Sequence, residues 1–112
     1  MKSLTCTLTC TLCVLIAFGL FGNVGAAEPK GKSLYRQRCD ICHQERGFGT
    51  AILARRVGAA RSLLEKRADL NPNYIRLAVR QGIGSMPRFT KVELTEDELQ
   101  AIIQYLNEQS SK

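Results

Sequence analysis

The sequence predicts an all-α domain, because its three clearest elements all read as helices. In the segment 31–42, Tyr35 and Cys39 stand at the i,i+4 spacing of neighbours on one helix face. A second helix start stands at residues 71–72, and a third helix carries a full capping signature at residues 94–99. No alternating, β-branched segment of the kind that forms a strand precedes Cys39. We therefore expect helices packed around one core.

After the first helix the sequence indicates less regular structure. In the segment 44–50, Gly47 and Gly49 stand at alternate positions, which is typical of a loop that passes close to a bulky group. Residues 51–57 and 62–67 then read as short helical pieces with a glycine between them.

The second long helix is expected to begin at Asn71-Pro72. The Asn side chain can accept from free backbone N–H groups of the first turn, and Pro has no N–H to leave unpaired. The helix should run to about Gln81 and stop at Gly82. A flexible turn, residues 82–85, follows it.

The last helix carries the clearest signal in the chain. Thr95 and Glu98 form a capping box, with Leu94 and Leu99 placed as a hydrophobic staple. Apolar side chains then recur at i, i+3, i+4 and i+7, in Leu99, Ile102, Ile103 and Leu106. This stripe has to be buried, and we expect the first helix to be its partner.

Residues 1–27 read as a secretory signal peptide. Lys2 supplies the positive start, residues 12–21 form an unbroken apolar run, and small residues precede a cleavage site near Ala27. The ten-residue run is too short to span about 30 Å of hydrocarbon. We expect a single mature domain, residues 28–112, in the bacterial periplasm without stable membrane insertion; an uncleaved anchor is the alternative.

The mature chain is basic, and its charge is uneven. Residues 28–91 hold 14 basic and 5 acidic side chains, whereas residues 92–112 hold 1 basic and 5 acidic. A basic body suits electrostatic steering to an acidic partner surface, although a merely solvated basic face would look the same. Nucleic-acid binding fits poorly, because export removes the substrate and no basic motif with interleaved aromatics is present.

Cys39, Cys42 and His43 form a C-x-x-C-H motif. Two thiols three residues apart can add to the two vinyl groups of haem, and the next imidazole then lies under the iron. The motif therefore predicts one covalent haem c with His43 as an axial ligand. Four arginines could stay in solvent or meet the haem propionates: Arg55, Arg56, Arg61 and Arg67.

Two other interpretations of the motif are weaker. A structural zinc site needs about four nitrogen or sulfur ligands, and beyond residue 27 the chain has no further Cys or His. A thioredoxin-like redox pair would stand at a strand-to-helix junction, and no strand pattern precedes the motif.

Met86 is the candidate for the second axial ligand, in the turn Gly84-Ser85-Met86-Pro87. An open iron favours peroxide or gas chemistry, whereas a second protein ligand leaves electron transfer. Ordinary core packing is the alternative for a lone Met, but this one stands in a Gly/Pro turn. Thioether ligation should raise the reduction potential, so the protein would pass electrons to a higher-potential acceptor such as a copper protein or another cytochrome.

With C-x-x-C-H near the start, a G-x-M-P turn two-thirds along and a capped helix at the end, the chain resembles small class I c-type cytochromes. The resemblance implies the class I cytochrome c fold, in which crossing N- and C-terminal helices pack around one covalent haem. Gly31 and Tyr35 match the contact positions on the first helix, and Ile102 and Tyr105 match the facing pair. The segment after His43 lacks the proline whose carbonyl commonly orients the ligand imidazole in this family.

The segment 49–103 is similar to the cytochrome subunits of bacterial flavocytochromes of the 4-cresol dehydrogenase (methylhydroxylase) and eugenol hydroxylase type. Matching positions include Gly49-Thr50, Arg56, Asp69-Leu70, Val79-Arg80 and Met86-Pro87. In those enzymes a large FAD subunit oxidises a para-alkylphenol and the cytochrome accepts the electrons one at a time. The resemblance implies an electron-transfer subunit rather than an enzyme in itself. A freely diffusing carrier for a terminal oxidase or several partners, and a haem enzyme or gas-binding protein, are the alternatives.

Overall fold

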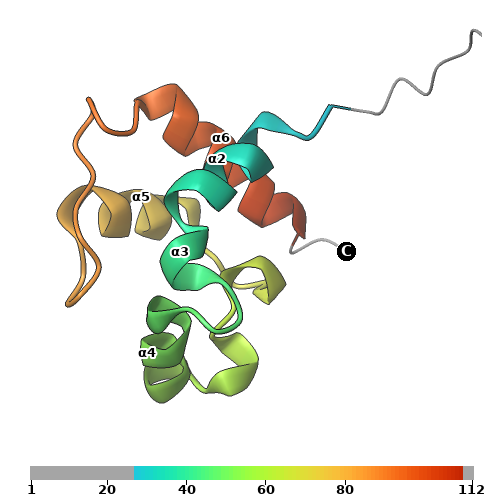
Figure 1. The fold of residues 1–112 in the computed structure, drawn as a ribbon, viewed down its shortest axis with the longest axis vertical. Helices are drawn as coiled ribbons and strands as arrows, with labels where there is room; N and C mark the ends of the chain where they lie inside the picture. Colours follow the sequence, from blue (N-terminus) through green and yellow to red (C-terminus); the bar gives the residue numbers. More distant parts are fainter. Residues whose placement is uncertain (1–26, 110–112) are drawn as a thin grey trace, which may run out of the picture.

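The computed structural model describes residues 27–109, and their regular structure is helical apart from one isolated bridge between residues 83 and 86. The α-helices of the described residues, labelled in Figure 1, are α2 (Lys30–Arg38), α3 (Asp40–His43), α4 (Phe48–Val57), α5 (Pro72–Gln81) and α6 (Glu96–Gln109). Two 3₁₀ turns, η2 (Ala59–Arg61) and η3 (Leu64–Lys66), connect α4 to α5. The predicted all-α fold is confirmed. The predicted signal peptide, apart from Ala27, lies outside the described residues.

The first and last helices cross, as the apolar stripe of α6 predicts (Figure 1). At Gly31 a Cβ atom would lie 2.2 Å from the carbonyl oxygen of Ala101 and 2.9 Å from Cβ of Tyr105, so only glycine allows this approach. The rings of Tyr35 and Tyr105 meet at a centroid distance of 5.7 Å. Gly31 therefore faces the Ala101 backbone and Tyr105, and Ile102 is buried in the same core as Tyr35 and Tyr105.

The first helix is shorter than the predicted segment 31–42. It ends at Arg38, and α3 begins at Asp40; Cys39 between them stays in the right-handed helical region, with φ −115° and ψ −37°. The Cys39 N–H still donates to the Tyr35 carbonyl at 2.8 Å. The break therefore falls at the first cysteine of the motif.

The predicted loop 44–50 is also shorter, because α4 begins at Phe48. Gly47 caps it in an extended conformation, and the Ala51 N–H donates to the Gly47 carbonyl at 3.0 Å. Residues 62–67 do not form one helical piece, since Leu63 is extended with φ −88° and ψ 112°. Within this segment only residues 64–66 are helical, as the 3₁₀ turn η3, and η2 lies before it.

The start of α5 follows the sequence prediction. The Asn71 side-chain oxygen accepts from the N–H groups of Asn73 at 2.8 Å and Tyr74 at 3.1 Å, and Pro72 is the first helical residue. The helix ends before Gly82, which has φ 74°. This left-handed conformation is the one that glycine adopts at little cost.

The capping box of α6 is confirmed. The Thr95 N–H donates to Glu98 Oε2 at 2.8 Å, and the Glu98 N–H donates to Thr95 Oγ1 at 3.3 Å. Leu94 and Leu99 on either side of the cap are both buried. The core consists of Tyr35, Val79, Leu94, Leu99, Ile102, Ile103, Tyr105 and Leu106. Among residues 27–109, each helix is too short or too polar to cross a membrane.

Candidate haem site

The break between α2 and α3 holds the two cysteines on one turn. Cys39 and Cys42 are free, partly buried thiols. The N–H groups of Cys42 and His43 both donate to the Cys39 carbonyl, at 3.1 and 3.0 Å. Burial, followed by the neighbouring Asp40, raises the pKa of the Cys39 thiol to about 12, so this thiol is protonated at neutral pH. The geometry presents two intact thiols beside one imidazole.

The C-x-x-C-H motif packs against the two glycines of the next segment. A Cβ at Gly49 would lie 3.1 Å from Cε1 and 3.3 Å from Nδ1 of His43, and a Cβ at Gly47 would lie 2.2 Å from the Cys42 carbonyl oxygen. The sequence predicted that these glycines approach a bulky group. In the structure they lie close to the motif itself, because α4 begins at once after the motif.

The His43 imidazole favours its neutral form. Burial lowers the pKa of the His43 imidazole, with Asp40 partly opposing, and the neutral ring is the form that binds a metal. Nδ1 is buried and has no hydrogen-bond partner within the described residues, which agrees with the absent proline.

Met86 closes a two-residue turn after α5. The Ile83 N–H donates to the Met86 carbonyl at 3.2 Å, and the Met86 N–H donates to the Ile83 carbonyl at 3.0 Å. Gly84 in the turn has φ 58°, and a Cβ at Gly82 would lie 2.6 Å from the Met86 carbonyl oxygen. Both glycines are therefore required by backbone geometry, and Met86 is partly buried against the core.

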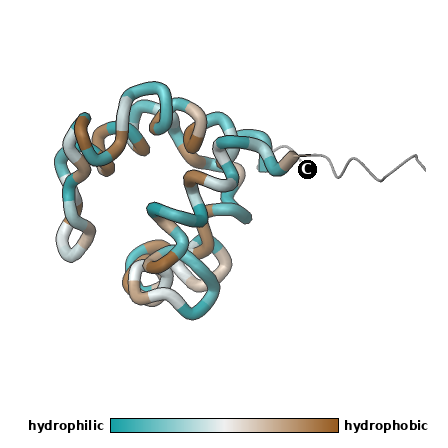
Figure 2. The backbone as a smooth tube through the Cα atoms, turned by 45° about the horizontal axis from the view of Figure 1, so that its top comes forward, coloured by the Kyte–Doolittle hydropathy of each residue, from teal (hydrophilic) through white to brown (hydrophobic). Residues whose placement is uncertain are grey.

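The motif and the methionine turn lie on separate arms of the backbone. Figure 2 shows the turn 83–86 on one arm and the α3–α4 segment on the other. Arg56 of α4 extends toward the turn, since a Cβ at Gly84 would lie 3.6 Å from Arg56 Nη2. Two thiols, a neutral imidazole and a thioether in a fixed turn are the donor set that a covalent haem requires. The residues present fit that group.

Of the four arginines considered for the haem propionates, two are already engaged in ion pairs. Arg61 and Arg67 both form ion pairs with Asp69, and Arg67 Nε donates to it at 2.8 Å. Within the described residues, no ion pair involves Arg55 or Arg56. Arg55 and Arg56 are therefore the better candidates for contacts with the haem propionates.

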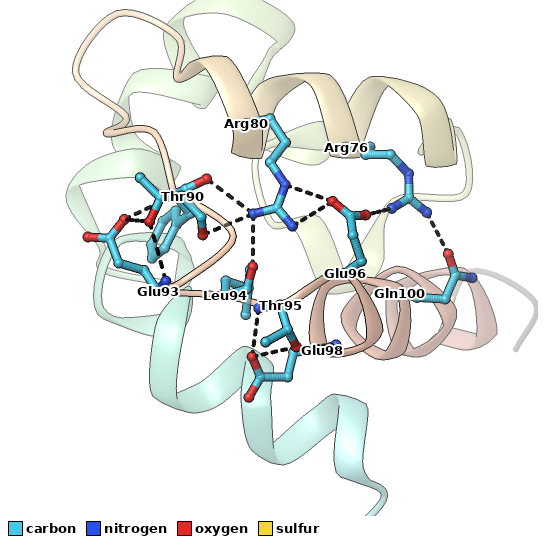
Figure 3. A network of polar contacts seen from close by, with 10 residues as sticks. Arg76, Arg80, Thr90, Glu93, Leu94, Thr95, Glu96, Glu98 and Gln100 are labelled. Carbon is cyan, nitrogen blue, oxygen red and sulfur yellow. Dashed lines mark hydrogen bonds and ion pairs between the residues drawn. The ribbon is translucent and has the colours of Figure 1, made fainter.

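No sequence motif indicates a role for Arg80, although Figure 3 shows it at the centre of a polar network. Its guanidinium joins α5 to Glu96 of α6 and to carbonyls of the segment between them. The bond from Arg80 lowers the pKa of the Glu96 carboxyl below its usual range. The partners stand 9 to 16 residues away in the chain, so no local motif marks the residue. The uneven charge of the chain was the available signal.

An all-α domain with crossing terminal helices, a C-x-x-C-H motif directly after the first of them and a methionine turn before the last is a small c-type cytochrome. The model of one protein family, described as cytochrome c oxidase, cbb3-type, subunit III, matches residues 26–106. The chain belongs to this family of cytochrome c domains, which bind covalent haem c and serve in electron transfer. Neither a curated protein nor a solved structure matches the chain.

Proposed function

We propose that residues 28–112 form a periplasmic electron carrier with His43 and Met86 as axial ligands and Cys39 and Cys42 as thioether attachments. The observation that carries the proposal is the C-x-x-C-H motif on one turn, with its neutral imidazole packed on Gly49. Haem c supplies reversible one-electron exchange when bound. The chain attaches it, orients it and keeps its ligands in place.

Each donor has a separate physical role in this proposal. The two cysteines hold the cofactor covalently, so that it stays bound in both redox states. The first turn of α4 limits rotation of the His43 ring, because the ring already contacts the Gly49 backbone. Met86 fills the remaining position and excludes oxygen, peroxide and other small ligands, and its thioether favours the ferrous state.

The ligand assignment is tested by optical spectroscopy of the oxidised, exported protein. It should show the weak far-red band of thioether-ligated ferric haem, and the reduced protein should not bind carbon monoxide. Met86→Ala should abolish the band and open the iron to carbon monoxide. Ile83→Ala, which changes the same turn without removing the thioether, serves as the control. A band that persists in the Met86 variant would show that another residue is the ligand.

The electron donor in this proposal is the FAD subunit of a dehydrogenase that oxidises a para-alkylphenol. Support comes from the residue pattern over 49–103 and from basic residues around the methionine turn that form no ion pair within residues 27–109. Arg88 and Lys91 are exposed just after Met86, and Arg56 approaches Gly84 from α4. Such a rim suits an acidic partner surface, and electrons leave where the cofactor lies nearest to the partner.

Electron delivery to a terminal oxidase is the second candidate, favoured by the description of the matched family. Purification of the native protein from a periplasmic extract separates the two. A subunit of a flavocytochrome should co-elute with a stoichiometric flavoprotein and become reduced when a para-alkylphenol is added. Elution without a flavin, together with rapid oxidation by a terminal oxidase, would support the second candidate instead.

A further inference from the structure

Arg80 lies on α5 and its side chain is only 18% exposed. Its Nη1 donates to three carbonyl oxygens: Phe89 at 3.1 Å, Thr90 at 3.2 Å and Leu94 at 2.9 Å. Its Nε and Nη2 donate to Glu96 Oε1 at 3.1 and 2.8 Å. Figure 3 shows the guanidinium between Glu96 and the carbonyls of Thr90 and Leu94. One side chain thus ties the segment 87–95 to the helices on both sides of it.

That segment begins directly after Met86 and leads into α6. The backbone of this segment is also bonded to α5 directly, because the Phe89 N–H donates to the Val79 carbonyl at 2.8 Å. Thr90 and Glu93 bond to each other in a local turn, so they add no link to α5. Three further links to the segment come from Arg80. Bonds from a charged, planar guanidinium are stronger and more directional than those between neutral groups.

We propose that Arg80 is the positioning residue for Met86. By fixing the segment after the methionine turn against α5, it holds the thioether where an axial ligand must stand. A ligand on a weakly anchored turn is easily replaced by an external molecule, because only its own bond to iron keeps it in place. The inference rests on Met86 being the axial ligand, as proposed above.

Arg76 provides a matched comparison on the same helix. It donates to Glu96 Oε2 at 2.6 Å and to Gln100 Oε1 at 2.6 Å, and both partners belong to α6. It shares the acidic partner of Arg80 but, within the described residues, none of the carbonyls of the segment 87–95. Loss of Arg76 therefore weakens the contact between α5 and α6 and leaves the methionine segment anchored.

The experiment measures displacement of Met86 by added imidazole in the haem-loaded, full-length protein. Arg80→Gln should raise the equilibrium constant for displacement on the order of tenfold or more, since bonds from a charged donor are lost. Arg80→Lys keeps the positive charge beside Glu96 but loses the forked guanidinium donors. Its displacement constant should rise almost as far. In Arg76→Gln the displacement constant should stay within about twofold of the parent value, while the melting temperature of the helices falls.

A second readout separates positioning from general stability. In Arg80→Gln the far-red band should disappear on heating before the helical circular dichroism does, whereas the two should melt together in Arg76→Gln. Equal displacement constants in the Arg80 and Arg76 variants would overturn the inference, and Arg80→Lys decides it if the glutamine variant does not fold. A parent protein without the band, or a Met86→Ala protein that keeps it, would instead overturn the ligand assignment.

Discussion

Tyr35 and Tyr105 meet where α2 crosses α6, and the environment of each hydroxyl is unusual. The Tyr105 hydroxyl donates to Glu65 of η3, and the buried Tyr35 hydroxyl has no partner within the described residues. Burial raises the pKa of Tyr35 and of Tyr105 well above the usual range, and Glu65 adds to the shift in both cases. The crossing therefore favours protonated tyrosines.

This arrangement predicts alkaline sensitivity of the fold. Because the folded state raises both pKa values, the stabilisation is complete below the unfolded pKa of about 10 and is lost as the pH rises above it. The free energy of unfolding, measured by denaturant titration at increasing pH, should fall above that point. In Tyr35→Phe/Tyr105→Phe the fall should be much shallower. Equal slopes in the parent and the double variant would show that these hydroxyls do not titrate with unfolding.

The sequence predicted which residues are candidate haem donors, but it did not predict which residues surround them. Cys39, Cys42, His43 and Met86 were predicted because each is chemically rare beyond residue 27 and stands in a short motif. The contact of Gly49 with the His43 ring was not predicted, since the glycine pattern reports a close approach without naming the neighbour. Their role as haem donors stays a prediction.

At the scale of elements, α6 was predictable because its signals are local. The capping box, the staple and the apolar stripe lie within one helix, and all are present in the structure. The break at Cys39 and the two 3₁₀ turns were not predicted. The 3₁₀ turns depend on backbone angles at single residues, such as the extended Leu63, that helix periodicity does not report.

Ile102 tests the packing of α6, because it is only 2% exposed. Ile102→Ala should lower the free energy of unfolding by about 2 to 5 kcal/mol, through lost burial and the cavity left behind. Gln104→Ala, at an exposed position of the same helix, should change it by less than about 0.5 kcal/mol. Denaturant unfolding of the haem-loaded protein measures both. A similarly small change at Ile102 would contradict the buried stripe.

At the scale of the whole molecule, the pairing of charged side chains differs between regions. Arg76 and Arg80 are paired with the acidic start of α6, whereas Arg88 is exposed beside the methionine turn without an ion pair in the described part of the chain. The uneven charge of the sequence predicted a basic body. It did not predict which cations are paired, because pairing depends on how α5 and α6 pack.

The proposed docking surface predicts a kinetic effect of charge. Arg88→Glu/Lys91→Glu should slow reduction by the dehydrogenase at low salt and flatten the dependence of the association rate on ionic strength. Lys30 lies on α2, away from the methionine turn in sequence, and Lys30→Glu is the matched single-charge control. Stopped-flow reduction across a salt series is the measurement. An unchanged rate and salt slope in the double variant would place docking on another surface.

The central claim is that this chain carries one haem covalently at Cys39 and Cys42. The direct measurement is the intact mass of the exported protein before and after acid–acetone extraction. We expect residues 28–112 plus the mass of one haem in both samples, and no haem in the solvent. Cys39→Ser/Cys42→Ser should lose the added mass under the same treatment. Release of haem from the parent protein, or a parent mass without haem, would contradict the account.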